Sequence, residues 1–295
     1  ALDAPPPNPL VDLPRVLVEV KGYGPNGAIK QMSMIVSKYA FDPAVPAMMT
    51  LIGTPGGSPT MSFESGSSAN HNYSAVDNAT GLPTGFPAFG TTNAADALKA
   101  ATESASNTTS TPAAAVLTSA SIPDYLQSPA EARKFLNLMQ GLASRGAVAS
   151  PTTATYCEPP AACIGKYASA ANSGSPVGLT FVKGNYTMGP GSGSGTLVVT
   201  GELTTNGGTN FNGLLYVIGA GYVNRDGGGG GAFYGANFIA RVDWPLAPED
   251  TGLPGFGAPF FQFNGAGNAT MQYDSLAVAN ALDLLSPPVL GVKEH

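Results

Sequence analysis

The chain has 295 residues, a length that can bury a sizeable core in one large domain or in two smaller ones. Charged residues make up 11% of it, against a usual content of about 25%, and 43% is hydrophobic, a combination that excludes a disordered chain. The net charge of −6 comes from 13 basic and 19 acidic residues, and such sparse Lys and Arg argue against a nucleic-acid partner.

A β-hairpin is the first element that the sequence predicts. β-Branched and other apolar residues predict strands over 16–20, 29–36 and 48–52. Asn26-Gly27 lies between the first two strands, and this dipeptide is a strong hairpin signal. Pro-rich residues 4–9 precede the hairpin and predict a stiff spacer in a processed or trimmed product. Residues 1–65 are therefore predicted as a Pro-rich arm and β-hairpin region.

Residues 66–150 are predicted as a loop and helical region. The segment 65–90 is rich in Gly, Ser, Asn and Pro, which favours loop. Residues 94–105 predict a helix with Asn93 as its N-cap. A Ser-Pro-Ala-Glu capping box, with Pro in the first helical position, opens a second predicted helix over 128–143.

Residues 151–295 are predicted as a disulfide loop, a parallel β-helix and a C-terminal capping helix. Short strands are predicted over 179–182, 196–199, 214–218 and 236–240, and a further turn of chain over 260–273. The strands recur at a spacing of roughly 20 residues, and units too small to bury themselves are typical of a solenoid, with a β-sandwich as the alternative. An amphipathic helix over 275–285 is predicted to cover the open end.

Two cysteines, Cys157 and Cys163, lie close together in the sequence. Their spacing is not that of a CxxC redox pair, and no nearby His completes a zinc site. A short-range disulfide is predicted, which would contribute roughly 2–3 kcal/mol and requires an oxidising compartment. Two free thiols are the alternative.

The sequence shows no catalytic set, so we expect a protein that is not an enzyme. His295 is the last residue and His71 lies in a predicted polar loop, which disfavours a Ser-His-Asp system. Gly191–Gly195 has Gly where a nucleophile elbow needs Ser, and Gly219–Asn224 lacks the last glycine of a dinucleotide fingerprint. Neither a cofactor nor a metal site is predicted, because the carboxylates are scattered as Glu202, Asp226, Asp243, Glu249, Asp250 and Asp274.

Glycines flank the predicted strands in three similar motifs, at 193–203, 211–219 and 230–240. These motifs resemble the C-terminal region of PilX-like, type IV pilus-associated (minor pilin-like) proteins. Residues 265–275 look like that family's closing element, and residues 18–28 are similar to the strand and turn that follow its N-terminal helix. The hydrophobic helix that anchors the family in a membrane has no counterpart in this sequence.

The resemblance implies a structural or adhesive protein of the bacterial envelope, associated with type IV pili or a related extracellular filament. It implies an extracellular, cell-surface or periplasmic location, and other pilin-like subunits or further copies of the chain as partners. Membrane contact would need the absent helix. The alternative is a glycan-binding or polysaccharide-degrading β-helix protein, whose surface contacts would be Tyr216, Tyr222, Tyr234 and Trp244. A bactofilin-like intracellular scaffold is a third hypothesis.

Overall fold

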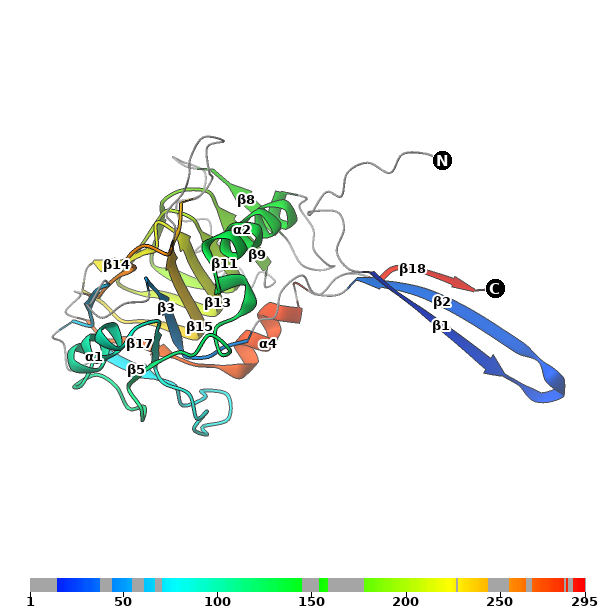
Figure 1. The fold of residues 1–295 in the computed structure, drawn as a ribbon, viewed down its shortest axis with the longest axis horizontal. Coiled ribbons are helices and arrows are strands. Elements are labelled where there is room, and N and C mark those ends of the chain that lie inside the picture. The colour runs from blue at the N-terminus through cyan, green and yellow to red at the C-terminus, as the bar shows by residue number, and fades with distance from the viewer. Residues whose placement is uncertain are drawn as a thin grey trace.

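The computed structural model describes residues 15–37, 44–54, 61–66, 71–144, 154–158, 178–226, 228–243, 255–263, 267–283, 285 and 289–294. Within these residues the chain is mainly β, with parallel sheets of ten and five strands and a three-stranded antiparallel sheet. The two parallel sheets and the helices form one body, and the three-stranded sheet projects from it (Figure 1).

The ten-stranded sheet is parallel at every neighbouring pair. Its main path runs through β7 (Ala114–Val116), β6 (Phe89–Thr91), β3 (Met49–Ile52), β15 (Gly231–Arg241), β13 (Thr209–Gly219), β11 (Gly191–Val199), β9 (Gly178–Val182) and β8 (Ala154–Cys157). Beside β15, the same sheet also contains β17 (Ala269–Gln272) and then β5 (His71–Ser74).

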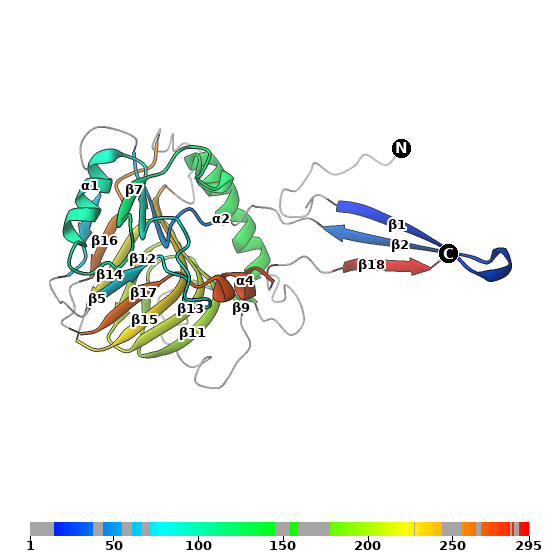
Figure 2. The ribbon, with the colours of Figure 1, turned by 90° about the horizontal axis from the view of Figure 1, so that it is seen from below.

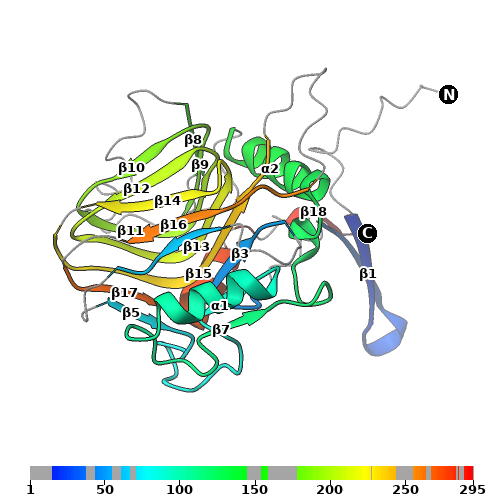
Figure 3. The ribbon, with the colours of Figure 1, turned by 60° about the vertical axis from the view of Figure 1, so that its left-hand side comes forward.

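The five-stranded sheet is also parallel throughout. It runs through β10 (Tyr186–Met188), β12 (Glu202–Asn206), β14 (Tyr222–Asp226), β16 (Phe260–Phe263) and β4 (Ser62–Glu64). Each of these strands is the next one in sequence after a strand of the larger sheet, so the chain alternates between the two sheets. Figure 3 shows β10, β12, β14 and β16 side by side.

Strands from the first third of the chain continue the sheets that the last third builds. β3 pairs with β15, placing Met49 beside Asn237, and β4 pairs with β16. β5 pairs with β17 in the same way. The three predicted regions therefore contribute strands to shared sheets, and no local sequence pattern indicates these distant pairings.

The main apolar core lies between the two parallel sheets. Its members alternate along each strand, and they include Val182, Leu197, Leu203, Phe211, Leu215, Val217, Val223, Ile239, Phe261, Phe263, Met49, Leu51, Phe63 and Phe89. Aromatic rings stack within it: Phe261 lies 4.9 Å from Phe263 and 5.3 Å from Phe63, measured between ring centroids. The apolar residues of the predicted strands therefore form the core between the sheets.

A second apolar core covers the other face of the ten-stranded sheet. It is formed by α2 (Pro129–Ser144), the 3₁₀ turn η2 (Asp124–Leu126) and α4 (Ser275–Asp283), packed on sheet residues such as Leu214, Tyr216, Ile218 and Phe238. Parallel sheets are usually buried on both faces, which explains the unbroken apolar run from Leu214 to Ile218.

The three predicted helices are present with nearly the predicted bounds. In α1 (Ala94–Glu103) the Asn93 side chain accepts the Asp96 amide at 2.8 Å, and the Ser128 hydroxyl accepts the Glu131 amide at 3.2 Å at the start of α2. The predicted place of the last helix was wrong. α4 contacts β11, β13 and β15 on the face of the sheet, and it is α1 that lies beyond β4, against β6 and β7.

The projecting sheet contains the predicted hairpin strands, β1 (Arg15–Tyr23) and β2 (Ile29–Ser37), paired antiparallel around a tight turn, η1 (Pro25–Gly27). Asn26 in this turn has a φ of 61°, which Asn tolerates better than most residues. A third strand, β18 (Val289–Glu294), pairs with β2 and was not predicted. Figure 2 shows the three strands side by side, away from the body.

The prediction of loop throughout residues 65–90 was wrong, because β5 lies within that segment and β6 begins at Phe89. His71, expected in a polar loop, is a buried residue of β5. Its Nδ1 atom lies 2.7 Å from the carbonyl oxygen of Ser65, and the Tyr73 hydroxyl donates to the same oxygen at 2.9 Å. β5 is a strand despite its polar residues because it pairs with β17, which supplies its backbone hydrogen bonds. The composition of the segment alone does not indicate this pairing.

Asp77 joins the loop after β5 to the N-terminus of α4. Its carboxylate accepts the Ser275 amide at 2.9 Å and the Ser275 hydroxyl at 2.7 Å, and also the Thr80 hydroxyl at 3.0 Å. Burial acts to raise the pKa of Asp77, but these hydrogen bonds outweigh it and the pKa lies below its ordinary value. A carboxylate at a helix N-terminus is further favoured by the helix dipole.

We expect Asp77→Ala to lower the free energy of unfolding by about 1–2 kcal/mol at pH 7, since several hydrogen bonds to a charged group are lost. Because the folded-state pKa is depressed, the deficit should be complete above about pH 4 and should shrink as the pH falls through the folded pKa. Urea unfolding over a pH series measures it. Asp283→Ala is the control, because Asp283 is exposed at the other end of α4, and it should change the free energy of unfolding little. A deficit of Asp77→Ala that does not depend on pH would contradict this assignment.

A row of stacked glycines lies in the middle of the long strands. Gly195, Gly213 and Gly235 are register partners on β11, β13 and β15, with φ values of 108°, 138° and 133°. A Cβ atom on Gly213 would lie 2.0 Å from the carbonyl oxygen of Gly195. Both the backbone conformation and the close approach of neighbouring strands therefore require glycine here.

Gly213→Ala is expected to lower the free energy of unfolding by about 3 kcal/mol or more. The positive φ is strained for alanine, and the added methyl group would overlap the carbonyl oxygen of Gly195. Gly189→Ala provides the comparison, since a Cβ there meets nothing within 4 Å and its φ is not positive. Chemical denaturation of both variants should show a large loss for the first and less than about 1 kcal/mol for the second. Equal losses would mean that the glycine row is not needed for stacking.

Candidate functional site

The outer face of the five-stranded sheet is the best candidate for a functional surface. Two rows of partly exposed side chains cross its strands in register: Thr187, Thr204, Asn224, Gln262 and Glu64 in one, and Glu202, Tyr222, Phe260 and Ser62 in the other. Inward-facing residues of the same strands, such as Leu203 and Phe261, are buried in the main core. The face is thus polar and regularly spaced, with an aromatic pair in its middle.

The aromatic pair is Tyr222 and Phe260, whose rings stack with centroids 4.0 Å apart and planes 3° from parallel. Burial raises the pKa of the Tyr222 phenol, and the nearby Glu202 carboxylate adds to the rise. The phenol therefore stays neutral at pH 7 and can donate a hydrogen bond. Beside it, the Gln262 amide donates to the Glu64 carboxylate at 2.8 Å.

The two described carboxylate side chains on this face, Glu202 and Glu64, lie on strands that are not neighbours. Glu202 lies on β12 and Glu64 on β4, with β14 and β16 between them. Three strand spacings separate their backbones by about 14 Å. Stacking and hydrogen bonding are the chemistry that the face offers.

The four aromatic residues predicted as surface contacts do not form one face. Tyr216 was wrongly placed: its exposed fraction is 0%, and it stacks on Phe238 at 4.9 Å beneath Phe135 of α2. Burial raises its pKa far above the ordinary value. Tyr222 is on the five-stranded sheet, Tyr234 is half-buried on β15 of the other sheet, and Trp244 lies outside the described residues. Phe260, the stacking partner of Tyr222, was not singled out by the sequence.

The predicted disulfide stays a prediction. Cys157 ends β8, which pairs with β9, and Cys163 lies outside the described residues.

The remaining carboxylates that are scattered along the sequence do not come together in the described residues. Within the described residues no three His, Cys, Asp or Glu side chains gather where they could hold a metal ion. Asp274 caps α4 by accepting the Ala277 amide at 2.8 Å. The backbone carbonyl of Asp243 accepts a hydrogen bond from Arg133, and Glu249 and Asp250 lie outside the described residues.

Arg225 is the most unusual buried residue, with an exposed fraction of 2%. It lies on β14, and its guanidinium carbon is 5.4 Å from the centroid of the Phe263 ring in the main core. One guanidinium nitrogen donates to the carbonyl oxygens of Gly229 and Asn268, whereas Nε and Nη1 have no hydrogen-bond partner. Burial lowers its pKa, with an opposing effect of Tyr73. The Arg225 side chain therefore connects, through buried hydrogen bonds, the two turns that contain Gly229 and Asn268.

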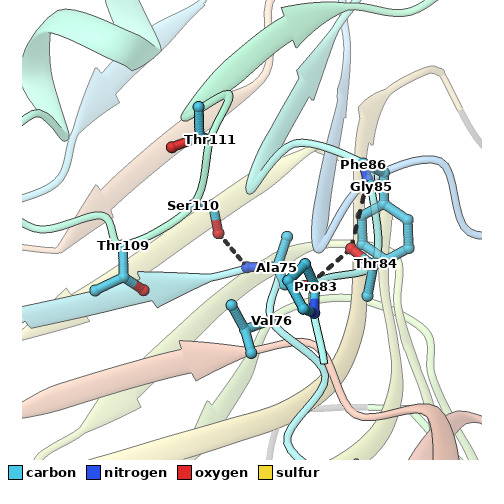
Figure 4. Close-up of a pocket in the computed structure, with 9 residues that line it drawn as sticks. All are labelled: Ala75, Val76, Pro83, Thr84, Gly85, Phe86, Thr109, Ser110 and Thr111. Atoms are coloured by element: carbon cyan, nitrogen blue, oxygen red, sulfur yellow. Dashed lines mark hydrogen bonds between the residues drawn. The ribbon is translucent and has the colours of Figure 1, made fainter. Parts of the chain in front are cut away.

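Among the residues that the structure describes, hollows open on the surface at two places beyond this sheet. One of about 290 Å³ lies between the loop after β5 and residues 109–111, where the Ser110 hydroxyl accepts the Ala75 amide and the Thr84 hydroxyl donates to the Ala75 carbonyl (Figure 4). The other, about 420 Å³, lies near the start of α2 and is lined mainly by apolar residues such as Leu117, Ile122 and Phe256. Neither brings together an acid, a base and a nucleophile.

No family model, curated protein or solved structure matches this chain. Among the helices of the described segments, none is long and apolar enough to span a membrane.

The contrast between the two tyrosines is testable. Tyr216→Ala should lower the free energy of unfolding by about 3–5 kcal/mol, because it empties a packed aromatic site. Tyr222→Ala should cost less than about 1.5 kcal/mol, since it removes one stacking contact on a partly exposed face. Equilibrium denaturation distinguishes the two, and a larger loss for Tyr222→Ala would contradict the burial described here.

Proposed function

We propose that this chain is a structural or adhesive protein of the bacterial cell surface, associated with type IV pili or a related extracellular filament, and that it carries out no catalysis. The observation that carries the proposal is the in-register stacking of parallel strand pairs on two sheets around an apolar interior. Such stacking gives a stiff body, which suits a mechanical or adhesive role better than one that depends on moving loops.

In this proposal the stacked strands form a short parallel β-helix. Successive strand pairs, β11 with β12, β13 with β14 and β15 with β16, are displaced by one strand spacing, about 4.8 Å. Equivalent residues then lie above one another, as Gly195, Gly213 and Gly235 do. The β3–β4–β5 segment adds the next turn at the β15 side, which supports a continuous stack.

Sequence features support the location and the partners. The PilX-like motifs at 193–203, 211–219 and 230–240 coincide with β11, β13 and β15, the strands that form the glycine row. A Cys157–Cys163 disulfide would suit the oxidising envelope or medium. The partners in this proposal are other pilin-like subunits or further copies of this chain.

A glycan-binding module is the second candidate, and one observation favours it. The Tyr222–Phe260 stack lies among amides, hydroxyls and carboxylates on an open sheet face. Aromatic platforms flanked by hydrogen-bonding groups suit sugar rings, which present apolar faces and hydroxyl edges.

The primary proposal is tested by locating the protein in the organism that makes it. Filaments sheared from intact cells should contain the protein in immunoblots, and immunogold should label the cell surface or the filaments. Detection in the cytosolic fraction alone would contradict the proposal and would favour the intracellular scaffold.

The glycan alternative is tested by affinity electrophoresis of the purified protein in gels that contain a panel of soluble polysaccharides. The structural proposal expects unchanged mobility with every polysaccharide. Retardation that Tyr222→Ala abolishes, and that Tyr234→Ala on the other sheet leaves intact, would instead support glycan binding by the outer face.

A further inference from the structure

The projecting three-stranded sheet exposes an unusual number of large apolar side chains. Leu17 and Val20 on β1 are each 58% exposed, Tyr23 is 76% exposed, and Ile29 on β2 is 64% exposed. Such residues lie on both faces of the sheet, because Leu17 and Val20 differ by an odd number of positions. Contiguous exposed apolar surface of this kind usually marks an interaction site.

Within the described residues, no strand pairs with the outer edge of this sheet. Among the described residues β1 pairs only with β2, while β18 takes the opposite edge of β2. β1 is nine residues long and contains neither proline nor a register shift in its pairing with β2. A long, regular edge strand presents a row of backbone donors and acceptors to which another strand can add.

The charges of β1 favour an antiparallel self-pairing centred on Val20 over the two registers next to it. In an antiparallel pair centred on Val20, residues 17–23 of the two copies lie opposite one another, and Glu19 faces Lys21 twice. A pair centred on Glu19 or on Lys21 would instead place two like charges directly opposite at its centre, which is destabilising.

We propose that two copies of this chain associate by antiparallel pairing of β1 with β1, about a two-fold axis that passes beside Val20. The proposal rests on the structural function proposed above and names its partner: a second copy of the chain. The pair joins the two small sheets into one six-stranded sheet. Leu17 then faces Tyr23 of the other copy, and Val18 faces Gly22, so the most exposed apolar side chains of β1 gain neighbours.

Charge reversal tests the register. Glu19→Lys should weaken self-association at least about tenfold, because two attractive pairs become two repulsive ones, and Lys21→Glu should do the same. The double variant Glu19→Lys/Lys21→Glu restores both pairs and should return to within about threefold of the unchanged protein. An equimolar mixture of the two single variants should associate better than either alone. Sedimentation velocity over a concentration series measures all four, with circular dichroism to confirm folding.

Cysteine cross-linking tests the axis. Directly opposite residues of an antiparallel pair have Cα atoms about 4.5–5.5 Å apart, within the range a disulfide needs. Val20→Cys should therefore form a covalent dimer under mild oxidation. Leu17→Cys is the matched control, because it has the same exposure and yet lies about 20 Å from its own copy in this register.

The outcomes separate this inference from the proposed function. A protein that is monomeric at every concentration, or that cross-links equally through Val20→Cys and Leu17→Cys, overturns the β1 pairing. If the same protein is still found on surface filaments, the structural function stands and only its partner surface is wrong. If it is cytosolic and yet dimeric through Val20→Cys, the pairing stands and the surface function fails.

Discussion

Parallel strand pairing in register is the constraint on which the rest of the structure depends. A parallel pair cannot be closed by a short hairpin, so the chain must leave each sheet and return before it can add a neighbour. Here it returns through the second sheet, and this path requires tight corners and glycines where backbones approach closely. The same arrangement buries the ten-stranded sheet on both faces and leaves the outer face of the five-stranded sheet open.

Local sequence signals predicted the three helices and the long parallel strands, but not β4, β10, β12 and β14 of the five-stranded sheet. Asn93 and Ser128 are caps whose side chains bind amides of the following turn, so the helices α1 and α2 begin where the sequence places them. Strands β9, β11, β13 and β15 were predicted because β-branched and aromatic runs alternate with glycine. These signals are local in origin: each depends on residues within a few positions of one another.

What the sequence could not predict depends on contacts between distant segments. The pairing of β3 with β15 joins residues near 50 and 240, and no local pattern encodes it. Tyr216 was expected as a surface contact of the glycan-binding alternative, but α2 covers the face of the ten-stranded sheet on which it lies. The stacking of Tyr222 on Phe260 likewise needs β14 and β16 to be neighbours, although a long connection separates them in the chain.

The central claim is that strands from both ends of the chain form one continuous stack. Hydrogen–deuterium exchange resolved by residue tests it most directly at β3 (Met49–Ile52), whose amides are bonded only if the distant pairing with β15 and β6 exists. The account predicts protection of these amides comparable to that of β13. Exchange of the β3 amides as fast as that of an exposed loop, with β13 still protected, would contradict it.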